Sequence, residues 1–178
     1  MDRERMNKPV NAGGGDFRPQ ENSHGTRFAV RLDDVGTHSL LAQWWEDDVP
    51  EWAEGDDGDL TIGFTPLPDS RLAVALSMLA RDDQPRAVRA DLIARYEVAV
   101  YEADSQPDEG NVEDTEKFLR SLPPQGLRMI ANQALRDAAP YIRESIQSTS
   151  MRLSPDKPLL IPGGIPVLPD NLEMEEAL

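Results

Sequence analysis

The feature that most constrains the fold of this chain is a period-two alternation of side chains over Arg86–Glu102. Every second residue from Val88 to Val100 is apolar, and the residues between them are mostly charged. This pattern predicts one long strand with a buried face and a solvated face. Arg71–Ala80 has the same period, and the connecting residues 82–85, with the sequence DDQP, are typical of a turn. The two segments should therefore form an antiparallel hairpin.

Two shorter segments, Arg27–Val35 and Leu60–Phe64, complete the predicted strands, and Pro66 should end the second. A sheet with one apolar face requires a covering layer. Residues 124–152 supply it as a helix, whose apolar residues recur at helical spacing: Leu127, Ile130, Ala131, Ala134, Leu135, Ala138, Ile142 and Ile146. Pro140 should kink or split this helix, because proline removes one backbone donor. The expected fold class is α+β, with a four-stranded antiparallel sheet covered by a long amphipathic helix.

The chain divides into three parts by composition. Residues 1–26 contain almost no apolar side chains, so nothing offsets the entropy of ordering them, and they are predicted to be a disordered N-terminal tail. Residues 27–169 form the predicted folded domain. Residues 170–178 are a short acidic C-terminal tail, and the prolines before it exclude a regular helix after Leu153.

The charge of the chain excludes two classes of partner. It carries 33 acidic residues against 18 Lys and Arg, a formal net charge of −15. Nucleic acid and anionic membranes are not expected partners, because long-range repulsion would oppose their encounter with this protein. No apolar run approaches the ~20 residues needed to span a bilayer. The first residues do not resemble a signal peptide, so the expected location is the cytoplasm.

The sequence offers little support for an enzyme. The chain has no cysteine, and its two histidines, His24 and His38, do not form an HExxH pair. Neither a phosphate-binding loop nor a G-x-S-x-G elbow is present. A hydrolase that uses two carboxylates has no specific support, because any pair can be nominated among 33 acids. No catalytic residue, metal or cofactor is predicted.

An aromatic cluster is the most unusual feature of the chain. All three tryptophans lie in one acid-rich stretch that shows neither strand nor helix period, together with three aliphatic residues: Leu40, Leu41, Trp44, Trp45, Val49 and Trp52. Such a stretch either packs into the core or presents a surface for flexible apolar ligands. The residues alone leave both interpretations open.

Residues 138–146, with the sequence AAPYIRESI, resemble the P-Y-x-R-E segment of SecB export chaperones. The order of elements also resembles that family: a strand, an aromatic crossover, a long hairpin, an acidic loop, the helix and a proline-rich exit. Arg152, Leu159 and Ile161 are similar to the family's exit pattern. The resemblance covers residues 27–169.

The resemblance implies an ATP-independent holdase that binds unfolded or nascent proteins in an apolar groove for protein export, with the SecA translocase ATPase as a further partner. Leu40–Trp52 corresponds to the family's crossover segment, so all six residues of the aromatic cluster are implied to bind the client. The family forms a dimer of dimers. A homotetramer, or a dimer because the second C-terminal helix is reduced, is therefore implied, with Tyr141, Ile142 and Ile146 at the interface.

Two alternatives remain at this stage. SecB-like proteins also occur as dedicated chaperones of antitoxins in toxin–antitoxin modules, which makes an antitoxin the alternative client. The protein could instead be an acidic inhibitor or nucleic-acid mimic that binds a basic partner. That alternative explains the charge but neither the tryptophans nor the helix motif.

Overall fold

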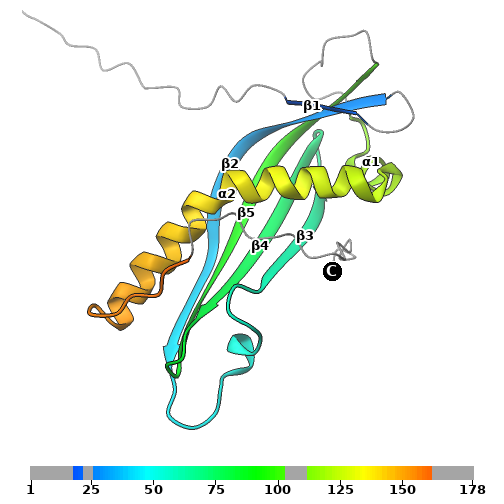
Figure 1. Cartoon of the computed structure of the whole chain (residues 1–178). Coiled ribbons are helices and arrows are strands. Elements are labelled where there is room, and N and C mark those ends of the chain that lie inside the picture. The colour runs from blue at the N-terminus through cyan, green and yellow to red at the C-terminus, as the bar shows by residue number, and fades with distance from the viewer. Residues whose placement is uncertain (1–17, 22–25, 103–111, 162–178) are drawn as a thin grey trace, which may run out of the picture.

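The computed structural model describes residues 18–21, 26–102 and 112–161, to which all structural statements here refer. One antiparallel sheet has the strand order β1-β2-β5-β4-β3, and α2 crosses one of its faces (Figure 1). The elements in chain order are β1 (Arg18–Glu21), β2 (Thr26–Trp44), the 3-10 turn η1 (Glu51–Ala53), β3 (Leu60–Leu67), β4 (Arg71–Arg81), β5 (Arg86–Glu102), α1 (Thr115–Ser121) and α2 (Pro124–Leu153). The predicted α+β class is confirmed.

The core lies between α2 and the sheet. The predicted hairpin is present, with Leu76 of β4 opposite Leu92 of β5. Alternate residues of both strands face α2 and are buried, as the period-two pattern predicts. Tyr96 of β5 fixes the helix in place, because its hydroxyl donates to Asp137 Oδ2 of α2 over 2.9 Å. Burial, and then the neighbouring Asp137, raise the pKa of the Tyr96 hydroxyl far above its ordinary value, so it remains a hydrogen-bond donor.

The long helix is continuous through Pro140. Pro124 opens α2 at a position where its missing N–H costs nothing. The helix changes direction near its middle (Figure 1), consistent with the predicted kink. Its buried side is the predicted apolar stripe, and only Leu127 among those eight residues is partly rather than fully buried.

Two strands extend beyond their predicted ends. β2 continues to Trp44, well beyond Val35, because two register shifts, after Leu32 and after Thr37, break the alternation that a sequence pattern detects. β3 passes through Pro66 to Leu67; as an edge strand it needs no donor on its outer side.

The sheet also has a short fifth strand besides the four expected ones. β1 pairs with residues 27–30 of β2. It lies inside the 1–26 segment that was expected to be disordered, so that expectation is wrong for residues 18–21. Residues 1–17, 22–25 and the predicted tail 170–178 lie outside the described residues.

Candidate functional site

The structure divides the aromatic cluster between the two faces of the sheet. Leu40 pairs with Ala90, and Trp44 pairs with Arg86. Ala90 belongs to the core under α2, and directly opposed residues share a face. Leu40 and Trp44 therefore lie on the α2 side. Leu41, one residue on, lies on the opposite face, because a step of one residue reverses the side chain.

Trp45 and Trp52 belong to a separate small cluster, so the structure does not bring all three tryptophans together on one face of the sheet. Both pack against Ala53, Leu79 and Ala87, with Leu79 and Ala87 on the face of the sheet opposite α2. The Trp45 backbone N–H donates to Pro85 O over 2.9 Å, which holds this residue at the hairpin tip.

The loop after β2 is fixed to this second cluster by Arg81. The Arg81 Nη1 donates to Gly55 O over 2.9 Å and to Ala53 O over 3.3 Å. The Asp57 side chain accepts from the backbone N–H of Arg81. Trp45 and Trp52 thus pack beside this loop, half-buried, on the face of the sheet opposite α2.

Exposed apolar side chains gather at the far end of β2. Among the described residues, four of the seven exposed large hydrophobic side chains lie within residues 40–49: Leu40 at 42% exposure, Leu41 at 38%, Trp44 at 43% and Val49 at 38%. The other three lie on α2 and the segment after it: Tyr141, Met151 and Leu160. The end of β2 and the loop after it therefore carry most of the exposed large apolar side chains of the described structure, with Leu40 and Trp44 together on the α2 side.

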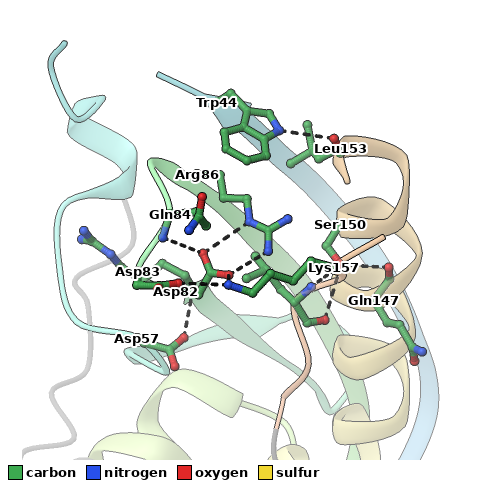
Figure 2. Close-up of polar contacts among 12 residues, drawn as sticks. Trp44, Asp57, Asp82, Asp83, Gln84, Arg86, Gln147, Ser150, Leu153 and Lys157 are labelled. Carbon is green, nitrogen blue, oxygen red and sulfur yellow. Dashed lines mark hydrogen bonds and ion pairs between the residues drawn. The ribbon is translucent and has the colours of Figure 1, made fainter. Parts of the chain in front are cut away.

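Trp44 joins this surface to the end of α2 (Figure 2). Its indole Nε1 donates to Leu153 O over 3.3 Å, one of the last carbonyls of the helix. The same ring lies 5.3 Å from the Cζ of Arg86, a cation–π contact. The tryptophan thus covers the gap between the strand and the helix terminus.

Arg86 lies beneath that indole and is 1% exposed. Its Nη2 and Nε donate to the two carboxylate oxygens of Asp82 over 2.7 and 3.3 Å. The hydrogen bond from Arg86 holds the pKa of the Asp82 carboxyl below its ordinary value, although partial burial opposes the shift. Lys157, after α2, lies 3.2 Å from Asp83 and 3.7 Å from Asp82. Arg86 was not among the functional residues predicted from sequence; its place four residues after Asp82, across the turn, is the signal that could have indicated the pair.

The exit segment returns along α2. Ser150 is fully buried, and its Oγ accepts from the Leu159 N–H over 3.0 Å. This bond brings Leu159 into the core, and Ile161 packs partly against it, whereas Arg152 is exposed. Two of the three residues that resemble the family's exit pattern thus have a structural role here.

Two of the three residues predicted at the oligomer interface are already buried within the single chain. Ile142 and Ile146 are 2% and 0% exposed within the single chain, because they continue the apolar stripe that faces the sheet. Tyr141 is 48% exposed on the outward side of α2. A shallow hollow on that side is lined by Pro140, Arg143, Glu144, Gln147, Ser148 and Met151.

The described residues contain neither a candidate metal-binding group nor a candidate membrane-spanning helix. No three His, Cys, Asp or Glu side chains described by the structure lie close enough together to hold a metal ion. No helix in the described ranges is long and apolar enough to cross a membrane.

Comparisons with known proteins add a structural similarity. No protein-family model matches the chain, and no curated protein matches it in sequence. A SecB-like chaperone from Mycobacterium tuberculosis, solved in complex with a ChAD peptide from the HigA1 antitoxin, is 18% identical, with a TM-score of 0.43 over 74% of this chain and 90% of that chain. This similarity is below the level that would establish a family, so the SecB-like resemblance stays a prediction.

Proposed function

We propose that this protein is a SecB-like, ATP-independent chaperone that binds extended apolar segments of unfolded or nascent proteins at the far end of β2. The observation that carries the proposal is the group of exposed apolar side chains at residues 40–49. Burial of apolar surface is non-directional and contributes roughly 25 cal/mol per Å², so such a surface binds many sequences.

The backbone of β2 supports this proposal. β1 pairs only with residues 27–30, and β5 occupies the other side of the strand. From Leu32 to Trp44, no described strand pairs with the outer edge of β2. An extended client can add to such an edge through its main chain, whatever its sequence.

Carboxylates keep this surface soluble without covering it. Glu46, Asp47 and Asp48 follow the apolar end of β2 and are exposed. Charges beside an exposed apolar strand oppose its pairing with other copies of the chain. The chaperone proposal thus explains why acidic residues lie beside exposed apolar side chains. The acidic-inhibitor alternative explains the charge but not the exposed apolar side chains.

The proposed clients are unfolded preproteins destined for export, with SecA as the downstream partner and the cytoplasm as the location. An antitoxin is the alternative client, and the same surface would bind its apolar segments. The proposed oligomer is a dimer of dimers. Its candidate surfaces are the polar part of the β2 edge, residues 32–39, and the outward side of α2 at Tyr141.

Binding of a permanently unfolded protein tests the proposal. Reduced, carboxymethylated α-lactalbumin should bind with micromolar affinity by calorimetry in the absence of nucleotide. Leu40→Ser should weaken binding about tenfold, since it removes one exposed leucine from the surface. Leu67→Ser is the matched control, because Leu67 ends β3 at the opposite edge of the sheet. Absence of binding by the wild-type protein, or equal losses in both variants, would contradict the proposal.

A further inference from the structure

The guanidinium of Arg86 is only partly satisfied. Two of its nitrogens donate to Asp82, but Nη1 is buried and has no hydrogen-bond partner among the residues that the structure describes. In Figure 2 this nitrogen carries no dashed line and lies on the side of the guanidinium toward α2. Buried N–H groups are almost always paired, so an unpaired donor on a buried cation indicates a missing acceptor.

The cover over this donor is held weakly. Trp44 lies above the guanidinium, is 43% exposed and makes one long hydrogen bond, to Leu153 O. It belongs to a strand that has no described neighbour on its outer edge at this position. A rotation of the indole would therefore expose Arg86 on the same face of the sheet as Leu40.

The local charges determine which acceptor fits. Two cations, Arg86 and Lys157, face two carboxylates, Asp82 and Asp83, so the group is already balanced. A further carboxylate would be unfavourable here, and the net charge of −15 also opposes an acidic ligand. The neutral acceptor that every extended apolar peptide carries is its backbone carbonyl.

We propose that Trp44 and Arg86 form a gated hydrogen-bond donor within the client site. An apolar client segment displaces the indole, and Arg86 Nη1 then donates to one backbone carbonyl of that segment. This inference rests on the proposed chaperone function. It adds a hydrogen bond from a side chain to a site whose other proposed contacts are apolar burial and main-chain pairing with β2.

The first test measures how much Arg86 contributes to peptide affinity. The probe is a blocked, neutral octapeptide of alternating Leu and Ser, and Arg86→Lys keeps the charge beside Asp82 but removes the guanidinium fork. Binding should weaken about tenfold. Arg89→Lys is the control, because Arg89 lies on the same strand but pairs with Asp91 on the face opposite α2. Unchanged binding by Arg86→Lys would overturn the inference.

A second measurement uses the wild-type protein, so it does not depend on the folding of a variant. Backbone amides of the octapeptide are replaced one at a time by esters, which make the carbonyl a weaker acceptor and also remove the amide N–H. One position should lose more affinity than the others in the wild-type protein. A uniform profile would overturn the inference, as would tighter binding of a peptide with Asp in place of Ser, which would indicate a carboxylate ligand.

The displacement of the Trp44 indole can be measured separately by tryptophan fluorescence. In a Trp45→Phe, Trp52→Phe background, Trp44 is the only tryptophan. Its emission maximum and acrylamide quenching should change when the octapeptide binds, and no change on binding would exclude displacement of the indole. Failure of the wild-type protein to bind either the octapeptide or α-lactalbumin would instead overturn the proposed function, and this inference with it.

Discussion

Arg86 stabilises the end of the molecule at which the β4–β5 turn meets the end of β2. It joins the hairpin turn through Asp82 to the end of β2 through Trp44. Breaking a buried pair by removing one partner is costly, because the remaining charge stays buried without compensation. The exposed ion pairs of the chain should matter far less.

We expect Asp82→Asn to lower the free energy of unfolding by about 2–3 kcal/mol, since it leaves the Arg86 guanidinium uncompensated. Asp83→Asn is the control: Asp83 is 78% exposed, and its change should stay within about 0.5 kcal/mol. Urea denaturation followed by circular dichroism measures both. Equal effects of the two substitutions would contradict the role given to Arg86.

The ion pair between Asp82 and Arg86 predicts that the stability of the protein decreases at acid pH. The pKa of Asp82 in the folded state lies below its ordinary value of 3.8. Its contribution to stability is therefore fully present above pH 3.8 and is lost as the pH falls through the lowered folded-state pKa. Urea midpoints of the wild-type protein and Asp82→Asn should converge in that acid range. A difference that persists to the lowest pH would contradict the assignment.

The elements that the sequence predicts well are those with an uninterrupted period. The β4–β5 hairpin and α2 follow from alternation and helical spacing, and Pro140 indicates the bend. The end of β2 was missed because its bulges break the alternation, and that loss also hid the separation of Trp44 from Trp45. The unpaired Nη1 of Arg86 was unpredictable from sequence, because it depends on which groups the folded hairpin brings within reach.

A pair of substitutions on α2 tests the assignment of its two sides. Ile146→Ala should destabilise the protein by about 2–4 kcal/mol, because it leaves a cavity in the core between helix and sheet. Tyr141→Ala removes a half-exposed side chain and should change the stability by less than about 1 kcal/mol. Thermal denaturation of both variants gives the comparison. A smaller effect for Ile146→Ala than for Tyr141→Ala would contradict the orientation of α2.

At the scale of the whole molecule, the two faces of the sheet differ in chemistry. The face under α2 holds the apolar core, whereas the other carries ion pairs between neighbouring strands, including Arg31 with Glu97 and Arg95 with Asp34. The exposed apolar side chains gather at one end, where β2, the hairpin tip and the end of α2 meet. One end of the molecule can thus bind an apolar chain while the ion-paired part of the sheet face opposite α2 remains solvated.

The proposed assembly predicts the mass in solution. For a tetramer, multi-angle light scattering should give about four times the chain mass of 19.8 kDa. For a dimer, it should give about twice the chain mass. A monomer at micromolar concentration would contradict the proposed pairing. Thr37→Asp changes the polar part of the β2 edge. It should shift the protein toward dimers and monomers, because two like charges then face each other across a two-fold pairing of this edge.

The most direct test of the central claim is suppression of aggregation. Chemically denatured citrate synthase is diluted into buffer with increasing amounts of this protein and no nucleotide, and light scattering is followed over time. The chaperone proposal predicts suppression at low micromolar concentration, and a Leu40→Ser, Trp44→Ser variant that remains folded should lose most of it. Undiminished scattering with the wild-type protein, or suppression that the double variant retains in full, would contradict the proposal.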